Sequence, residues 1–183
     1  MSKVLVFLAQ GFEEIEGLTV VDLGRRAGLD IKTVSITGEN VVTGARGIPV
    51  VADVLFDDAD IDSADMLVLP GGMPGTKNLE AYEPLMAKVD AFAAGDKYIA
   101  AICAAPTVFG HRGLLKGKNA CCYPGMEGDL VGASANENSV NIDGKIITSR
   151  GLGTAIDFSL AIISELIDQA TADKIGASVV YNK

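Results

Sequence analysis

Short apolar runs alternate with longer stretches of helical periodicity along most of this chain. The pattern predicts strands over residues 4–9, 31–36, 66–69, 97–102, 118–122 and 146–149. It predicts helices over residues 14–27, 79–94 and 154–167, with a further helix beginning at 105. Strands that alternate with helices pair in parallel and are covered by helices on both faces. We therefore expect a doubly wound α/β fold with a mostly parallel sheet.

Two segments that break the alternation predict antiparallel hairpins. Val41–Val51 is interrupted by glycine and contains Pro49, which a strand tolerates only near a sheet edge. Asp143-Gly144 lies between apolar runs and is typical of a tight hairpin turn.

Gly151–Thr154 lacks the third glycine of a dinucleotide loop and is interpreted as a tight strand-to-helix turn that supports the site. No repeat or linker is visible, so we expect one domain over residues 1–183.

Charge and hydropathy exclude several classes of partner. The chain carries 15 Lys and Arg against 24 Asp and Glu, a net charge of −9, and no basic run exceeds two residues. Nucleic acids and anionic membranes are therefore not expected partners. No apolar stretch approaches the length of a membrane span, and the N-terminal apolar run is too short for a signal peptide.

The cysteine pattern indicates a reducing compartment. Cys103, Cys121 and Cys122 make an odd count without C-x-x-C spacing, so neither a disulfide framework nor a metal site is expected. We interpret Cys121 and Cys122 as packing residues at a strand end. The sequence thus predicts a cytoplasmic protein with no metal and no cofactor.

Cys103 is the candidate nucleophile because it stands between a strand and a helix. The strand ends at Ile102, and Pro106 fits the first turn of the helix, where its missing N–H costs nothing. A thiol at this corner faces the positive end of the helix dipole, which lowers a cysteine pKa and favours the thiolate. The alternative is a small buried hydrophobe, since free cysteine is among the most buried residue types.

Other groups are expected at the same edge of the sheet. Ligands of doubly wound sheets bind outside the carboxyl ends of the strands. The first, third and fourth predicted strands lead to Glu16, to Gly71 and Gly72, and to Cys103. If these strands are neighbours, a carboxylate and a thiol meet there. The backbone N–H groups of Gly71, Gly72 and Ala104 would then form an oxyanion hole; the alternative for the glycines is a plain turn.

Glu16 is the candidate proton carrier. Glu13 and Glu14 are explained as acidic residues at a helix start, whereas Glu16 lies on a different helical face. Beside Cys103, a carboxylate and a thiolate together would repel each other, so Glu16 would hold a proton and hydrogen-bond the thiolate. His111, the only histidine, is about 12 Å from Cys103 along a helix, which excludes a cysteine–histidine dyad within that helix.

Five motifs occur in order along nearly the whole chain: residues 11–16 (GFEEIE), 25–28 (RRAG), 69–72 (LPGG), 101–107 (AICAAPT) and 148–154 (TSRGLGT). Together they resemble the ThiJ/PfpI superfamily, and most of all its DJ-one branch. The resemblance implies a flavodoxin-like three-layer sandwich that forms a homodimer. It also implies a reactive Cys103 at a strained nucleophile elbow and a protonated Glu16. The resemblance further implies that the backbone N–H groups of Gly72 and Ala104 bind an oxyanion. It implies supporting roles near the site and the dimer interface for Gly71, Arg26 and Arg46.

The sequence departs from the family at two positions. Relatives in this branch often carry a histidine before a proline downstream of the cysteine, where this chain has Tyr123 before Pro124. A mechanism that needs an imidazole there is therefore in doubt. Ala104 stands where peptidase-like relatives have histidine, which argues against a peptidase.

The resemblance implies two functions. One is a glutathione-independent glyoxalase or deglycase acting on 2-oxoaldehydes such as methylglyoxal, or on glycated substrates, with Cys103 as nucleophile and Glu16 as proton carrier. The other is a non-enzymatic oxidative-stress sensor or chaperone in which Cys103 is oxidised to sulfinic acid. Both need a reactive thiol, so the sequence alone does not separate them.

Overall fold

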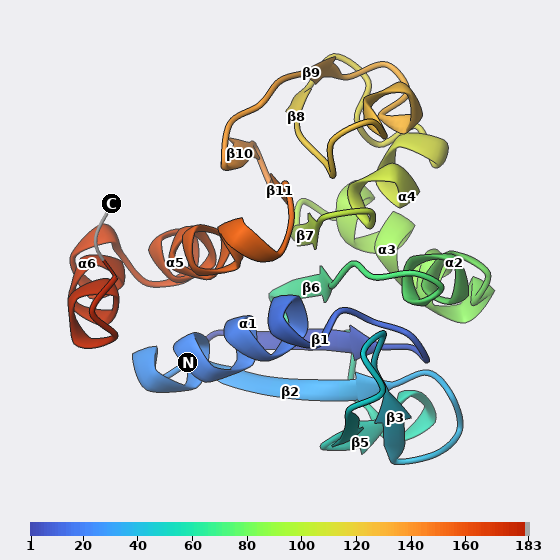
Figure 1. Cartoon of the computed structure of the whole chain (residues 1–183), viewed down its shortest axis with the longest axis vertical. Coiled ribbons are helices and arrows are strands. Elements are labelled where there is room, and N and C mark those ends of the chain that lie inside the picture. Colours follow the sequence, from blue (N-terminus) through green and yellow to red (C-terminus); the bar gives the residue numbers. More distant parts are fainter. Residues whose placement is uncertain (182–183) are drawn as a thin grey trace.

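A seven-stranded sheet forms the centre of the computed structural model, which describes residues 1–181 (Figure 1). Its strand order is β10-β11-β7-β6-β1-β2-β5, and every pair is parallel except β10 with β11. The strands are β1 (Lys3–Leu8), β2 (Asp30–Ser35), β5 (Val54–Leu55), β6 (Met66–Leu69), β7 (Tyr98–Ile102), β10 (Val140–Asp143) and β11 (Ile146–Ser149). The predicted mostly parallel sheet is confirmed, and β1, β6 and β7 are neighbours as the site required.

Helices cover both faces of the sheet. They are α1 (Glu14–Ala27), α2 (Gly75–Glu80), α3 (Glu83–Ala94), α4 (Pro106–His111), α5 (Ala155–Leu166) and α6 (Gln169–Ser178), with 3₁₀ turns η1 (Phe56–Asp58), η2 (Glu127–Asp129) and η3 (Leu152–Thr154). One buried cluster joins the sheet to α2, α3 and α4, and a second joins it to α1, α5 and α6. The result is the predicted three-layer sandwich.

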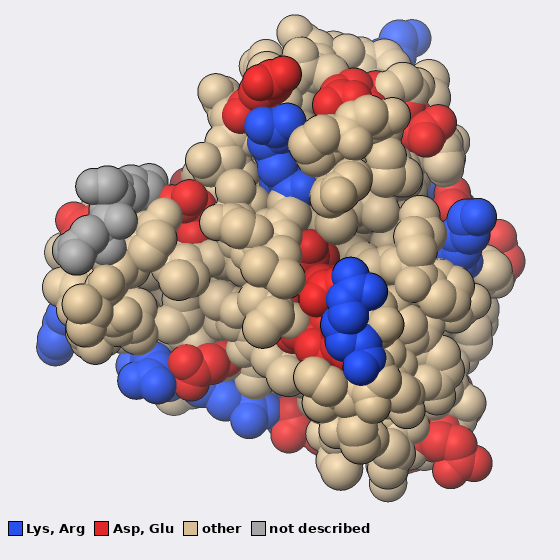
Figure 2. Space-filling view, in the orientation of Figure 1, with Lys and Arg blue, Asp and Glu red and all other residues tan. Residues whose placement is uncertain are grey.

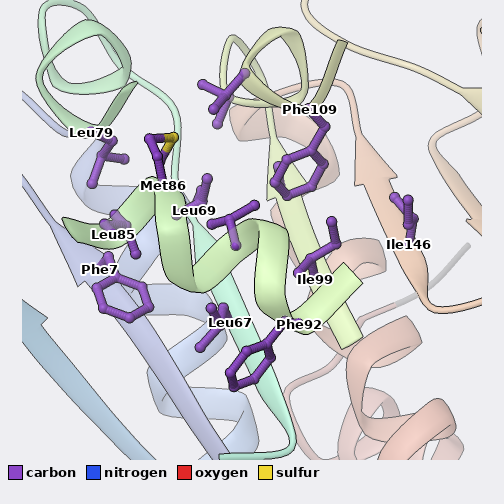
Figure 3. Packing of buried hydrophobic residues seen from close by; sticks show 14 of the residues in the cluster. Phe7, Leu67, Leu69, Leu79, Leu85, Met86, Phe92, Ile99, Phe109 and Ile146 are labelled. Atoms are coloured by element: carbon purple, nitrogen blue, oxygen red, sulfur yellow. The ribbon is translucent and has the colours of Figure 1, made fainter. Parts of the chain in front are cut away.

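The apolar runs form buried strands because both faces of the sheet are covered. In β6, Leu67 and Leu69 pack in one cluster while Met66 and Val68 pack in the other, and all four are fully buried or nearly so. Alternate side chains point to opposite faces, so a strand covered on both faces has apolar residues at every position. Each fully buried side chain of this kind contributes about 1.5–3 kcal/mol. Figure 3 shows the first cluster around Leu67 and Leu69.

The predicted hairpins are present. The strands β3 (Val41–Thr43) and β4 (Pro49–Val51) pair antiparallel as a separate two-stranded sheet. β10 and β11 pair antiparallel around Asp143 and Gly144, and Gly144 has a φ of +64° that favours glycine.

Three elements differ from the sequence prediction. The helix expected over 79–94 is two helices, because the chain turns at Ala81 and Tyr82 and Pro84 opens α3. The strand expected over 118–122 shrinks to β8 (Asn119–Ala120), which pairs with β9 (Ser134–Ala135) outside the main sheet. The prediction missed α6, which Asp168 caps by accepting a hydrogen bond from Thr171 N at 2.7 Å.

Within residues 1–181, no helix is long and apolar enough to cross a membrane. The assignment of residues 1–183 to a single domain stays a prediction, and its last two residues lie outside the described part of the chain.

Candidate active site

Cys103 occupies a strained turn between β7 and α4. Its φ of +66° lies in the left-handed region that non-glycine residues rarely adopt. Two hydrogen bonds hold the residue in this conformation. Cys103 N donates to Ser149 O at 3.0 Å, and Cys103 O accepts from Tyr123 N at 2.7 Å. The half-buried thiol is thereby fixed at the carboxyl end of the sheet, as the sequence predicted.

Glu16 meets Cys103 in the interior. It lies in the first turn of α1, its side chain is 1% exposed, and its carboxyl group is hydrogen-bonded to the Cys103 thiol. Gly71 N donates to Glu16 Oε2 at 2.9 Å, and Leu152 N donates to the same carboxyl group. The structure therefore brings together the thiol and the carboxyl group that were singled out from the sequence.

Gly71 allows this contact because it has no side chain. A β-carbon at Gly71 would lie 2.5 Å from Cys103 Cβ and 2.6 Å from Glu16 Oε2. No real β-carbon comes so close to another heavy atom, so any larger residue would push the thiol and the carboxyl group apart. Gly72, with a φ of +91°, is equally restricted, since a β-carbon there would lie 2.4 Å from Glu13 N.

Burial raises the pKa of Glu16 from 4.5 to about 7. The nearby negative charge of Glu13 acts in the same direction. The hydrogen bonds with Cys103, Gly71 N and Leu152 N oppose the shift by stabilising the carboxylate. Glu16 thus titrates near neutral pH, where a proton-transfer group is most effective.

The expectation of a lowered Cys103 pKa is wrong, although the N–H at the helix start does act in that direction. Burial, followed by the charge of Glu16, raises the pKa of this thiol to about 12, while hydrogen bonds from Gly72 N and Ala104 N act in the opposite direction. The sequence indicated the helix but gave no measure of the burial. Because the two groups interact, the first ionisation is a property of the pair and not of either residue alone. Below the Glu16 pKa of about 7 the pair therefore holds two protons, and above it the pair holds one.

Two of the three predicted backbone donors bind the sulfur. Gly72 N and Ala104 N both donate to Cys103 Sγ, and Gly71 N binds the carboxyl group of Glu16 instead. If the sulfur bonds to a carbonyl carbon, the oxygen on that carbon would lie near these two N–H groups, which are already oriented. The turn interpretation of Gly71 and Gly72 is thus incomplete, because their N–H groups bind the two reacting side chains.

An acidic hollow and two cavities mark the surface of the molecule. Figure 2 shows a hollow near the centre of this face, where acidic atoms lie beside a basic side chain. One cavity of about 660 Å³ lies between β10, α5 and α6, and another of about 300 Å³ lies beside Gln10 and Tyr82. Neither Cys103 nor Glu16 lines these cavities.

Known proteins share this architecture. The DJ-1/PfpI family matches residues 2–165. This chain belongs to the DJ-1/PfpI family. The chain is 36% identical to Protein dj-1beta of Drosophila melanogaster over 187 residues, which cover all of both chains. It is 31% identical over 151 residues to a deglycase of Pyrococcus abyssi, covering 81% of this chain and 89% of that protein.

Three further comparisons define the extent of the DJ-1/PfpI match. Protein DJ-1 homolog B of Arabidopsis thaliana is 39% identical over 180 residues, which make up 97% of this chain and 41% of that protein. This chain thus spans less than half of that relative. The structure of oxidized Toxoplasma gondii DJ-1 superposes with a TM-score of 0.96 at 36% identity, and a Salmonella typhimurium DJ-1 superfamily protein with 0.94 at 33% identity; each pair is covered completely.

In this DJ-1/PfpI protein the two predicted arginines lie in different places. The Arg46 side chain is 73% exposed, and its Nη2 lies 3.7 Å from Glu13 Oε2 beside the reacting pair. Arg26 lies in the last turn of α1, about 15 Å along the helix from Glu16, and pairs with Asp22 at 3.0 Å. The role of Arg26 near an interface between copies stays a prediction.

Glu14 has a structural role that the sequence reasoning missed. This buried residue accepts hydrogen bonds through Oε1 from Arg46 N at 2.9 Å and Ile48 N at 3.3 Å. A β-carbon at Gly44 would lie 2.2 Å from Glu14 Cδ. Glu14 thus anchors the β3–β4 loop against the start of α1. Gly44 lies in that loop, far along the sequence, so no local pattern indicated the contact.

The remaining candidates lie away from the reacting pair. His111 Nδ1 is 2.7 Å from Glu80 Oε1, and His111 Nε2 is 3.7 Å from Asp129 Oδ1. Cys121 and Cys122 are buried, and burial raises the pKa of both thiols. Within residues 1–181, no group of three or more His, Cys, Asp or Glu side chains is arranged to hold a metal ion.

Proposed function

We propose that this protein is a cysteine-dependent, glutathione-independent glyoxalase or deglycase that acts on small 2-oxoaldehydes such as methylglyoxal. One observation carries the proposal: a buried carboxyl group with a pKa of about 7 is hydrogen-bonded to a thiol surrounded by backbone N–H groups. A nucleophile with an adjacent base is the arrangement that covalent catalysis requires. The deglycase name of the Pyrococcus relative supports the same chemistry.

The first step forms a hemithioacetal. Cys103 Sγ bonds to the aldehyde carbon while the Glu16 carboxylate accepts the thiol proton, so the high thiol pKa does not prevent attack. The aldehyde oxygen gains the electron pair of the broken carbonyl π bond. It then takes a proton from Glu16, which returns that group to its carboxylate form. Gly72 N and Ala104 N, which donate to the sulfur, would stabilise the developing oxyanion.

The second step moves a proton between adjacent carbons. Glu16 removes the proton from the carbon bonded to sulfur, and the electron pair moves onto the ketone oxygen to give an enediolate. Glu16 returns the proton to the neighbouring carbon while the hydroxyl proton on the first carbon passes to the second oxygen, which gives a thioester of the 2-hydroxy acid. Water then hydrolyses the thioester, which releases lactate from methylglyoxal and restores the thiol. No external oxidant or reductant is consumed, since one carbon is oxidised as its neighbour is reduced.

The test is lactate formation from methylglyoxal by the purified protein. We expect Cys103→Ser to abolish it. Cys121→Ser, which changes a buried packing thiol, is the matched control and should retain it. Lactate formation by Cys103→Ser at the wild-type rate would refute the proposal.

A sensor role is the second candidate, because the donors around Cys103 Sγ would also bind the oxygens of a sulfinic acid. Here hydrogen peroxide oxidises the thiol to sulfenic acid with release of water, and a second peroxide gives sulfinic acid. The high thiol pKa opposes this route, since the thiolate is the form that reacts. Mass analysis after mild peroxide treatment should find oxygen on Cys103 before Cys121 or Cys122. Earlier oxidation of either buried cysteine would exclude the sensor role.

We also propose that the protein is a cytoplasmic homodimer. Ile15, Ile48 and Val51 are exposed apolar side chains near the start of α1 and on the adjoining β3–β4 hairpin. The bond from Ala45 N to Phe12 O, 2.7 Å long, joins these two segments. Light scattering should give twice the chain mass, and Ile48→Glu should give a monomer. A wild-type monomer at micromolar concentration would contradict this assembly.

A further inference from the structure

Gly151 has no side chain, and the space that a β-carbon would occupy there lies beside the reacting groups. A β-carbon placed on Gly151 would lie 3.6 Å from Tyr123 Cδ2, 3.9 Å from Glu16 Oε1 and 4.0 Å from Cys103 Sγ. These are ordinary van der Waals separations, so a carbon atom fits there without displacing a neighbour. A substrate carbon in this space would contact an aromatic ring, the carboxyl group and the thiol at the same time.

The backbone does not require glycine at this position. Gly151 has φ 160° and ψ −169°, an extended conformation that any residue adopts. Crowding does not require it either, in contrast to Gly71, where a β-carbon would clash with Cys103 at 2.5 Å. The effect of a side chain at Gly151 would instead be to fill the space beside the thiol.

Tyr123 forms one wall of this space. Its backbone N–H donates to Cys103 O at 2.7 Å, which fixes its position relative to the nucleophile. The residue is 52% exposed, so its ring borders both the space over Gly151 and the solvent. An aromatic ring offers a flat apolar surface that favours stacking with another ring. The opposite wall is the carboxyl group of Glu16, which disfavours an anionic substituent.

We propose that the space over Gly151 seats the substituent of the 2-oxoaldehyde and that the Tyr123 ring packs against it. The preferred substrates are then aldehydes with an aromatic or other flat apolar substituent, such as phenylglyoxal, over methylglyoxal. The catalytic part of this inference rests on the proposed function. The seat itself would also bind other thiol-reactive molecules of the same shape.

The first experiment compares kcat/KM for phenylglyoxal and methylglyoxal. Tyr123→Ala should lower the ratio of phenylglyoxal to methylglyoxal about fivefold, whereas Tyr123→Phe should preserve it. Gly151→Ala should lower turnover of both aldehydes by more than about tenfold, because its methyl group fills the seat. Gly153→Ala is the matched control in the same turn, where a β-carbon meets nothing within 4 Å, and should behave as wild type.

The second experiment needs no turnover. The rates at which N-phenylmaleimide and N-methylmaleimide alkylate Cys103 are measured by peptide mass analysis and normalised to a free thiol. The phenyl preference should fall in Tyr123→Ala and persist in Tyr123→Phe. Gly151→Ala should slow both reagents.

The two experiments separate the seat from the proposed function. If neither aldehyde is turned over but the alkylation ratio still depends on Tyr123, the proposed function fails and the seat stands. If Tyr123→Ala leaves the alkylation ratio unchanged, or Gly151→Ala reacts as wild type, the seat is refuted.

Discussion

The carboxyl group of Glu16 and the thiol of Cys103 are hydrogen-bonded to each other, although the two residues are 87 positions apart in the sequence. Burial raises the pKa of both groups, to about 7 for Glu16 and about 12 for Cys103. One proton is therefore retained by the pair through the physiological range. This shared proton explains how a thiol with a high pKa can act as a nucleophile.

The pH dependence of turnover should follow Glu16. Below its pKa both groups are protonated and no base is available, so kcat/KM for methylglyoxal should rise as the pH increases through about 7. No fall is expected before the pH approaches the thiol pKa of about 12. A pH–rate profile of the wild-type protein checks this. A rate that is constant from pH 5 to 9 would show that the pair does not control the reaction.

The same pKa shift predicts how stability depends on pH. The folded-state pKa of Glu16 is raised from 4.5 to about 7, so its stabilising contribution is fully present below pH 4.5 and is lost as the pH rises through about 7. Glu16→Gln cannot ionise at this position. Relative to wild type, the free energy of unfolding of this variant should therefore increase by about 3 kcal/mol between pH 4.5 and pH 8.

Urea denaturation of both proteins at the two pH values measures this difference. Glu137→Gln changes an exposed carboxyl group and serves as the control. An equal free-energy difference between wild type and Glu16→Gln at both pH values would contradict the raised pKa.

Gly71 should tolerate no side chain. A methyl group at Gly71 would meet Cys103 Cβ at 2.5 Å and Glu16 Oε2 at 2.6 Å. Gly71→Ala should therefore lower the free energy of unfolding by about 1–3 kcal/mol and separate the reacting pair. Gly128→Ala, where a β-carbon meets nothing within 4 Å, is the control for thermal denaturation and turnover. Wild-type turnover by Gly71→Ala would show that the close approach is unnecessary.

The parallel sheet could be predicted because its apolar runs are local signals. Met66–Leu69 and Tyr98–Ile102 are buried on both faces, so each has an uninterrupted apolar sequence that is visible without the structure. The placement of Cys103 followed from the strand before it and Pro106 after it. Glu16 was singled out as its partner by its place after the first strand, and the family motifs implied the same role.

The energetics of the site could not be predicted in the same way. The Cys103 pKa depends on how deeply the surrounding chain buries the thiol, and no local pattern encodes that depth. Likewise, the contact of Glu14 with the loop near Gly44 joins segments that are distant in the sequence. The short strand at Asn119 also depends on pairing with Ser134, which composition does not reveal.

Lactate formation by Glu16→Gln is the most direct test of a catalytic Glu16–Cys103 pair. Glutamine can still hydrogen-bond the thiol but cannot accept its proton, so turnover of methylglyoxal should fall by at least about a hundredfold. Because the charge of Glu16 raises the thiol pKa, ultraviolet titration of the same variant should show a lower Cys103 pKa than in wild type. A large loss of turnover with the thiol still titratable is the result we predict. Turnover equal to that of wild type would show that Glu16 is not the proton carrier.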